Sequence, residues 1–277
     1  MMNSQRSTNM NIVRDKNLLK RRIAYFIKSG RGGRENETAL INALSEKARL
    51  YVFGGLIRDI SLYSAYHFCS DIDLVFEGSK KQLYQALSDY GLQDVHENKF
   101  GGFRVKDFAV DIDVWSFEET WAFKNQFISP HNIESLLYTT LMSWDSVLYD
   151  IQNNQIITTD SWLTDIHRGK LDVVLEHTPN VSGSLMRILR TIYGKNVLIL
   201  GEKLCHFLAE SLGYYSDREL VNNENEHFKT LCINSIKLGK LRKELEQWSG
   251  NGELKINRHL YAKQLELFPS INNEKMR

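Results

Sequence analysis

The feature that most constrains the fold of this chain is a pair of glycines, Gly54-Gly55, between two short apolar runs. The first run, Leu50–Phe53, stops at the glycines, and the second carries the stretch Asp71-Ile-Asp73-Leu. Alternation of polar and apolar side chains with a period of two is typical of a strand, so we expect both carboxylates on one face. The segment therefore predicts strand, glycine turn, helix and strand, which is an α/β order.

Two carboxylates side by side on one strand repel each other, and burying them without a partner is costly. A divalent cation relieves this repulsion, and Mg²⁺ is commonly held by one or two carboxylates together with substrate phosphates. Two glycines after a strand let the backbone approach a phosphate closely. Asp71, Asp73, Gly54 and Gly55 together indicate metal-assisted nucleotidyl transfer.

A second acidic pair follows in the stretch Phe108–Trp115, which we expect to form a strand. Its Asp111 and Asp113 lie on one face by the same alternation. Two-metal phosphoryl chemistry commonly uses a further carboxylate beside a first pair. If this strand neighbours the strand after Asp71, one of the two aspartates completes the cluster, and we favour Asp113 over Asp111. The alternative is that alternating aspartates mark an exposed strand face.

The rest of the chain predicts an α/β head followed by helices. Helices are expected at residues 18–27, 37–47, 56–63 and 80–90, and strands at residues 50–53, 71–76, 103–105, 108–115 and 155–158, with further sheet or hairpin structure over 137–150. The pattern then changes to amphipathic helices, at residues 184–193, 197–212, 217–231 and 233–247. We expect a basic helical arm (1–47), a head domain with a mixed sheet (48–175) and a smaller helical C-terminal domain (176–277).

Composition narrows the class of protein. The chain is 42% hydrophobic and 25% charged, an ordinary globular balance, and its net charge of +1 recommends neither nucleic acid nor an acidic partner. Its three cysteines lack CxxC spacing, which fits a reducing compartment and gives no zinc signature. No apolar stretch approaches the roughly 20 residues of a membrane helix, and the N-terminus does not resemble a signal peptide. We expect a soluble, cytoplasmic protein without membrane contact.

The N-terminal segment is locally basic although the whole chain is nearly neutral. Its basic residues, opposed by Asp15 alone before Glu35, are Arg6, Arg14, Lys16, Lys20, Arg21, Arg22, Lys28, Arg31 and Arg34. One interpretation is a solvated arm. The other is an arm that contacts the phosphates of RNA or DNA.

The stretches 54–59, Gly-Gly-Leu-Ile-Arg-Asp, and 71–75, Asp-Ile-Asp-Leu-Val, resemble the head-domain motif of a known family. This is the bacterial poly(A) polymerase and CCA-adding tRNA nucleotidyltransferase family, part of the DNA polymerase β-like nucleotidyltransferase superfamily. Its pattern is Gly-Gly-x-x-Arg-Asp followed by Asp-x-Asp on the next strand. The resemblance covers residues 48–115 and extends to about 195, where the stretch 186–190, Met-Arg-Ile-Leu-Arg, is similar to the first helix of the family's neck.

The resemblance implies a polymerase-β-like head and a role for each matching position. The implied nucleotide-binding residues are Gly54, Gly55, Arg58, Asp59, Arg187 and Arg190. The implied ligands of Mg²⁺ or Mn²⁺ are Asp71, Asp73 and Asp113, and Asp111 or Asp113 would help to deprotonate the attacking hydroxyl. Arg58 would contact phosphate or brace its loop, and Asp59 would orient Arg58 or the nucleotide. Arg187 and Arg190 could equally pair with carboxylates. The resemblance further implies an NTP substrate, ATP or CTP, and in-line attack that releases pyrophosphate.

The acceptor is less constrained than the chemistry. The family's Arg-Arg-Asp stretch before the last part of the head is absent, and Thr140 replaces its Asn. RNA, with a tRNA-like 3′ end, is the leading acceptor. Nucleotidylation of a protein or small molecule, or a non-catalytic nucleotide- or RNA-binding role, are the alternatives. The sequence leaves open which NTP is used, how many nucleotides are added and the oligomeric state.

Overall fold

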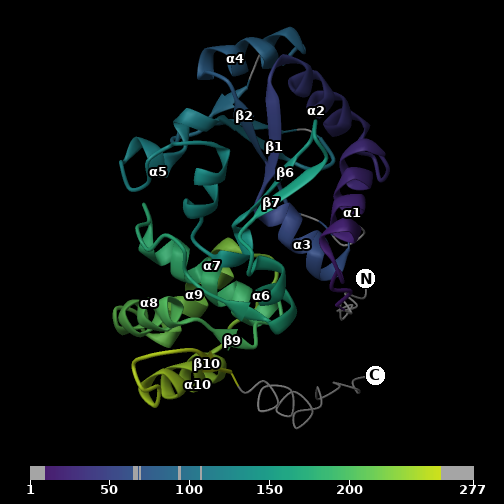
Figure 1. Ribbon diagram of the computed structural model, residues 1–277. Helices are drawn as coiled ribbons and strands as arrows, with labels where there is room; N and C mark the ends of the chain where they lie inside the picture. The colour runs from purple at the N-terminus through teal and green to yellow at the C-terminus, as the bar shows by residue number, and fades with distance from the viewer. Residues whose placement is uncertain (1–9, 65–67, 69, 93–94, 107, 257–277) are drawn as a thin grey trace, which may run out of the picture. The chain divides into compact units, whose positions relative to one another are not determined.

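The computed structural model describes residues 10–64, 68, 70–92, 95–106 and 108–256. The chain divides into two compact units, which Figure 1 shows as ribbons. Unit 1 comprises Met1–His167 and Val174–Thr178, and unit 2 comprises Arg168–Val173 and Pro179–Arg277. Arg6, the first member of the basic run, lies outside the described residues. No helix in the described ranges is long and apolar enough to cross a membrane.

Within the described residues, unit 1 is built on a seven-stranded sheet with the order β3-β4-β5-β2-β1-β6-β7. The strands are β1 (Arg49–Phe53), β2 (Ile72–Glu77), β3 (His96–Glu97), β4 (Phe103–Val105), β5 (Ile112–Ser116), β6 (Val147–Asp150) and β7 (Gln155–Thr158). β2 and β5 run parallel, and the other pairs are antiparallel. The expected α/β head with a mixed sheet is therefore confirmed.

Helices cover one face of this sheet (Figure 1). They are α1 (Lys16–Lys28), α2 (Glu35–Lys47), α3 (Gly55–Tyr63) and α4 (Lys80–Asp89). Helix α1 begins where the Asp15 side chain accepts a hydrogen bond from Leu18 N at 2.7 Å, and α4 begins at a capping box between Ser79 and Gln82. The basic segment thus contains two helices that pack in unit 1, α1 on α3 and α2 on β1.

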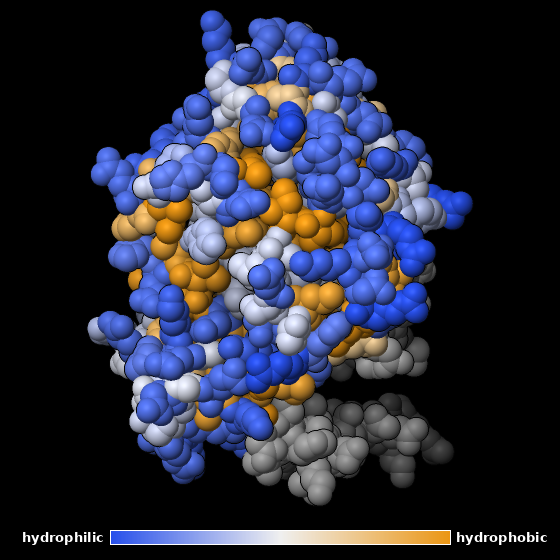
Figure 2. Space-filling view, in the orientation of Figure 1, coloured by the Kyte–Doolittle hydropathy of each residue, from blue (hydrophilic) through white to orange (hydrophobic). Residues whose placement is uncertain are grey.

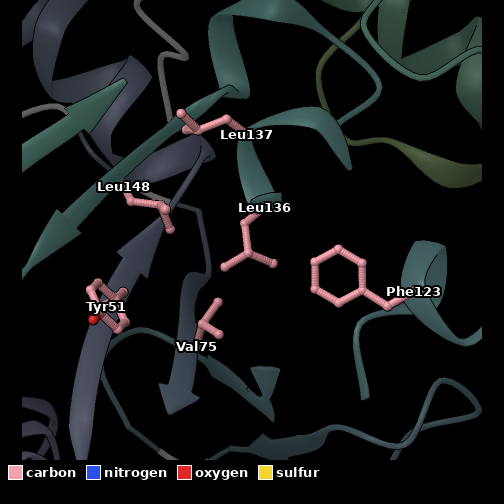
Figure 3. Close-up of a cluster of buried hydrophobic side chains, with 6 residues drawn as sticks. All are labelled: Tyr51, Val75, Phe123, Leu136, Leu137 and Leu148. Carbon is pink, nitrogen blue, oxygen red and sulfur yellow. The ribbon is translucent and has the colours of Figure 1, made fainter. Parts of the chain in front are cut away.

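The opposite face of the sheet carries an apolar cluster. It joins strand side chains with those of α5 (Trp121–Lys124) and of a 3-10 helix (Ile133–Tyr138), and its members are Tyr51, Val75, Phe123, Leu136, Leu137 and Leu148. Figure 3 shows the Phe123 ring extending from α5 toward Leu136. Figure 2 shows that hydrophobic patches also reach the mostly hydrophilic surface. Because side chains alternate along β2, Asp73 lies on the same face as Val75.

In the described part of unit 2, four helices accompany a small sheet with the order β10-β9-β8. The elements are β8 (Lys170–Leu171), α7 (Val181–Gly194), β9 (Ile199–Leu200), α8 (Glu202–Gly213), α9 (Asp217–His227), α10 (Ser235–Glu246) and β10 (Leu254–Lys255). Asp172 accepts a hydrogen bond from Leu204 N at 2.8 Å and so caps α8 from outside that helix. A Cβ on Gly201 would lie only 2.1 Å from Asp172 Cγ, so this cap requires glycine there. Burial raises the pKa of Asp172.

Two elements expected in unit 1 are shorter than the sequence indicates. The strand expected over residues 108–115 is β5, which begins only at Ile112, because Val110 N donates to the Glu37 side chain at 2.7 Å rather than to a strand. The stretch 137–150 is strand only in β6. Before β6 lies the 3-10 helix Ser143–Asp145, held by the Ser146 hydroxyl, which donates to Leu137 O at 2.7 Å.

Two expected helices of unit 2 also differ, and the one expected over 217–231 ends at His227 as α9. The helix expected over 197–212 starts at Glu202, because Ile199–Leu200 forms β9 and pairs with both β8 and β10. Unit 2 is therefore mainly helical, as expected, with a small sheet that the helical periodicity did not predict. Further short helices among the described residues are the 3-10 helix Phe117–Glu119, which lies in unit 1, and α6 (Trp162–Arg168).

Candidate active site

Gly54 ends β1 and starts α3 in a backbone conformation that favours glycine. Its φ is +64°, its N–H donates to Val147 O at 3.0 Å, and its C=O accepts from Arg58 N at 3.1 Å. A Cβ at this position would lie 3.4 Å from Asp145 O and would carry the strain of a positive φ. Gly55 then opens helix α3. The N–H groups of a first helical turn lack partners within the helix, so this turn can accept an anion.

Arg58 is held between two carboxylates at the start of α3. Its Nε donates to Asp59 Oδ1 at 2.7 Å, and its Nη1 donates to Asp145 Oδ1. All three side chains are nearly buried, with 11%, 14% and 8% of their surface exposed. Burial by itself lowers the pKa of Arg58, but the charges of Asp145 and Asp59 outweigh it and raise this pKa above its usual value. These contacts favour the bracing role for Arg58 and the orienting role for Asp59.

The four aspartates singled out in the sequence are brought together by the sheet, and we call them the carboxylate row: Asp71, Asp73, Asp111 and Asp113. The expected neighbour relation is present, because β2 and β5 are parallel and Asp73 lies opposite Asp113. Asp111 precedes β5, and its C=O accepts from Ile72 N at 2.8 Å, which sets it beside Asp71.

The glycine turn and the carboxylate row lie at the same edge of the sheet. β1 and β2 are antiparallel, with Val52 opposite Leu74, so the continuation of β1 into Gly54 runs past Asp73. The two stretches that the sequence singled out therefore meet in space.

Arg104 on β4 joins two members of the carboxylate row. Its Nε and Nη2 donate to Asp113 Oδ1 and Oδ2 at 2.8 and 2.6 Å, and Nη2 also donates to Asp71 Oδ2 at 2.8 Å. The contact follows from the register, because β4 is antiparallel to β5 with Arg104 opposite Asp113. The hydrogen bonds to Asp113 raise the pKa of Arg104. About a third of this side chain is exposed, at 35%.

The donor set of the row suits a hard divalent cation, because such ions prefer carboxylate oxygens. Asp71, Asp73 and Asp113 could hold Mg²⁺ or Mn²⁺ from adjacent strands. As they stand, no group of three His, Cys, Asp or Glu side chains among the described residues is arranged to hold a metal ion. The guanidinium of Arg104 instead supplies positive charge between Asp71 and Asp113. Binding of a metal ion would therefore involve a shift of Arg104.

A pocket of about 570 Å³ adjoins the row. Its lining includes residues from the loop between α1 and α2, from the segments before β2 and before β5, and from β4: Gly32, Arg34, Phe68, Asp71, Arg104 and Asp111. Asp111 and Asp71 therefore face a space that a substrate could enter.

The two arginines implied as nucleotide ligands in the neck-like helix lie on α7 of unit 2. Arg190 donates to the buried Glu224 carboxylate and to Thr230 O, and its guanidinium lies 3.9 Å from the centre of the Phe228 ring. Pairing with a carboxylate, the alternative that the sequence left open for Arg190, is thus present within unit 2. Arg187 is exposed on the same helix.

Two residues of this site were missed from the sequence. Arg104 could have been found only from the register of β4 against β5, which brings it opposite Asp113. Asp145 sits in a 3-10 turn far from Arg58 in the chain, and no local pattern marks it. A charged residue within a largely apolar stretch, as in Leu141-Met-Ser-Trp-Asp145-Ser-Val-Leu148, is a weak signal of a buried ion pair.

Comparison with known proteins rests on structure alone. No protein-family model matches the sequence, and no curated protein is similar to it. Among solved structures, the Thermotoga maritima CCA-adding enzyme complexed with tRNA matches with a TM-score of 0.58 at 15% identity, over 86% of this chain and 55% of that one. A CCA-adding enzyme with CTP matches with a TM-score of 0.56 at 14% identity, over 84% and 55%. A tRNA-processing enzyme in an apo form matches with a TM-score of 0.54 at 16% identity, over 92% and 64%.

The chain thus spans less than two thirds of each of these neighbours. At these identities the likeness establishes the fold. Its mixed α/β sheet with flanking helices is the nucleotidyltransferase head fold of CCA-adding enzymes.

Proposed function

We propose that the chain is a metal-dependent nucleotidyltransferase that moves a nucleoside monophosphate from ATP or CTP to a hydroxyl at the 3′ end of RNA, with a tRNA-like RNA as the leading acceptor. The observation that carries this proposal is the meeting of the Gly54 turn with the carboxylate row at one edge of the sheet. The solved structures with this fold include complexes of CCA-adding enzymes with tRNA and with CTP, which supports the choice of substrates.

The triphosphate would lie against Gly54 and Gly55, where the backbone can approach closely and the first turn of α3 presents N–H groups. Arg58, fixed by Asp59 and Asp145, keeps this turn in place. Asp71, Asp73 and Asp113 would hold Mg²⁺, which when bound neutralises phosphate charge and polarises the reacting phosphoryl group.

The acceptor hydroxyl would attack the α-phosphorus of the NTP. A new bond forms between the acceptor oxygen and this phosphorus, the bond to the β-phosphate oxygen breaks, and pyrophosphate leaves. We assign the proton of the hydroxyl to Asp111, because it lines the pocket, whereas Asp113 is bound by both ends of the Arg104 fork. Rate enhancement would come mainly from positioning and charge stabilisation.

The test is incubation of the full chain with each of the four NTPs, labelled at the α-phosphate, together with Mg²⁺ and total RNA. We expect label in RNA with ATP or CTP, and loss of this label in Asp73→Asn, which keeps the shape of the side chain and removes its charge. Asp160→Asn is the matched control, because Asp160 is exposed and outside the site.

The outcomes separate the alternatives. Label on protein or on a small molecule alone would replace RNA as the acceptor while preserving the chemistry. Equal labelling by the wild type and Asp73→Asn would refute the catalytic proposal. Absence of transfer, with NTP or RNA still bound by the wild type, would support a non-catalytic binding protein.

A further inference from the structure

We propose that the pocket beside the carboxylate row binds the terminal phosphodiester of a single-stranded RNA acceptor, and that Arg34 is the residue that contacts this phosphate. The inference rests on the proposed function, because it names the acceptor subsite of the same centre. It concerns a part of the chain, the loop between α1 and α2, that lies outside the motif stretches of the sequence.

The position of the pocket follows from the strand order. β2 lies between β1 and β5, so the Gly54 turn approaches the row from the β1 side. The lining of the pocket includes Asp111 and the segment before it, and none of the lining residues belongs to the Gly54 turn. Phosphoryl transfer places the attacking and leaving oxygens roughly in line, on opposite sides of phosphorus. With the triphosphate at Gly54, the acceptor therefore enters from the pocket.

The charged residues that line the pocket determine how the 3′ end of the acceptor is oriented in it. Asp71 and Asp111 line the pocket and repel phosphate, whereas Arg34 supplies a cation from the loop. The acceptor hydroxyl is therefore expected near Asp111, and the phosphate that precedes it near Arg34. Arg104 also lines the pocket, but its guanidinium is paired with Asp71 and Asp113.

Arg34 is held in place by stacking on an aromatic ring. Its guanidinium carbon lies 4.1 Å from the centre of the Phe26 ring, and its buried Nε has no hydrogen-bond partner in the part of the chain that the structure describes. Phe68, which also lines the pocket, packs edge-on against Phe26 at 5.3 Å. A guanidinium that is oriented by an aromatic ring and lines a pocket is suited to phosphate.

The glycines of the loop make room for this side chain. Gly32 has a φ of +79°, and a Cβ there would lie 2.9 Å from Arg34 Nη1. Gly33 has a φ of +78°, yet the nearest atom to its Cβ would be Ala109 Cβ at 4.0 Å. The two positions carry the same backbone strain, but only a side chain at Gly32 would displace the guanidinium.

The surroundings of the pocket favour RNA over a protein acceptor. Arg31 on the same loop and Lys28 in the last turn of α1 are exposed. A polynucleotide has further phosphates that can pair with such residues beyond its terminal nucleotide, and a protein hydroxyl does not.

The experiment measures binding of a short fluorescent oligoribonucleotide with a free 3′ hydroxyl to the full chain by anisotropy, over a series of salt concentrations. We expect Arg34→Gln to raise the Kd about tenfold, as for loss of a charge-assisted hydrogen bond, and to reduce the salt slope by about 0.7, the value for one phosphate contact. Arg34→Lys should restore much of the affinity. Gly32→Ala should weaken binding more than Gly33→Ala.

The control is Lys81→Gln, a charge change at an exposed position of α4 outside the pocket lining. Equal effects of Lys81→Gln and Arg34→Gln would mean a general basic field and would overturn the inference, as would unchanged binding in Arg34→Gln. Urea unfolding checks that each variant is folded, and NTP binding should not change. If the wild type binds RNA in the expected pattern but transfers no nucleotide, the proposed function fails and the subsite stands. Transfer to protein with RNA binding unaffected by Arg34→Gln would overturn the subsite alone.

Discussion

Two arginines of unit 1 each bridge a pair of aspartates, but one bridge is buried and the other faces solvent. Arg58 joins Asp59 and Asp145 with 11% of its side chain exposed. Arg104 joins two members of the carboxylate row with 35% of its side chain exposed, beside the pocket. An arginine between two aspartates can therefore be a fixed structural contact where it is buried, as at Arg58, and a counter-charge that another cation can replace where it is exposed, as at Arg104.

The difference follows from the cost of separating charges. Removing one partner of a buried ion pair leaves an uncompensated charge without water, whereas a partly exposed pair can be replaced by solvent or by another cation. We infer that Arg58 fixes the Gly54 turn, while Arg104 is a counter-charge to the row that another cation could replace.

The largest expected effect is on stability. Arg58→Gln should reduce the free energy of unfolding by about 3–5 kcal/mol, because Asp59 and Asp145 remain buried without their cation. Arg104→Gln should change it by about 1 kcal/mol or less. Urea unfolding of both variants measures this contrast. Similar losses of unfolding free energy in the two would contradict the distinction between a buried and an exposed bridge.

The glycine turn gives the next contrast, with Gly54→Ala against Gly55→Ala. Alanine at Gly54 should cost about 1–3 kcal/mol, because φ is +64° and the added Cβ approaches Asp145 O at 3.4 Å. Alanine at Gly55 meets only the Arg58 side chain, at an ordinary 3.6 Å, and should be nearly neutral for stability. Thermal unfolding measures both, and a destabilised Gly55→Ala with a normal Gly54→Ala would contradict the local geometry.

Metal binding tests the exchangeable role of Arg104. Removing its charge in Arg104→Gln should tighten Mn²⁺ binding about tenfold, since a unit charge about 6 Å from a divalent ion contributes ~1.4 kcal/mol at the dielectric of water. Titration of free Mn²⁺ by electron paramagnetic resonance gives the Kd. Lys80→Gln, which removes a charge at the start of α4, is the control. Weaker Mn²⁺ binding in Arg104→Gln would mean that Arg104 supports the metal site rather than competing for it.

The smallest effect belongs to a third bridge, on the surface of unit 2. Glu253 accepts from Arg168 Nη2 at 2.7 Å and pairs with Lys170 Nζ at 2.9 Å. The hydrogen bond from Lys170, and to a smaller extent that from Arg168, lowers the pKa of Glu253 below its ordinary 4.5. A folded-state pKa below the unfolded value gives stability that is present above pH 4.5 and is lost as pH falls through the folded pKa. The free energy of unfolding of the wild type should slightly exceed that of Glu253→Gln at pH 7, and this difference should vanish at low pH or high salt. A difference that persists at low pH would rule out the ion pair as its source.

The sequence predicted those parts of the molecule that depend on local pattern. The alternation of polar and apolar residues after Asp71 predicted the strand that the structure has as β2, and Gly54-Gly55 predicted the turn into α3. The acidic strand was recognised, but its start was not, because Glu37 binds Val110 N from a distant helix and ends the pairing there. The residue pattern within one stretch of sequence contains no information about a contact with a distant helix.

The missed parts depend on register and on distant partners. Arg104 becomes a site residue only through its pairing opposite Asp113, and Asp145 only through Arg58. Helix α8 likewise begins at Glu202 because its cap comes from Asp172, which directly follows β8 and is distant from α8 in the sequence. The roles of the carboxylate row and of Arg187 and Arg190 in binding nucleotide stay predictions.

The central claim is that the carboxylate row and the Gly54 turn transfer a nucleotidyl group. The most direct measurement is a comparison of ATP or CTP labelled at the α-phosphate with the same nucleotide labelled at the γ-phosphate, incubated with Mg²⁺, RNA and the full chain. We expect α-label in the RNA and γ-label only in released pyrophosphate, with both signals lost in Asp73→Asn. Retention of γ-label in the acceptor, or transfer that survives Asp73→Asn, would contradict it.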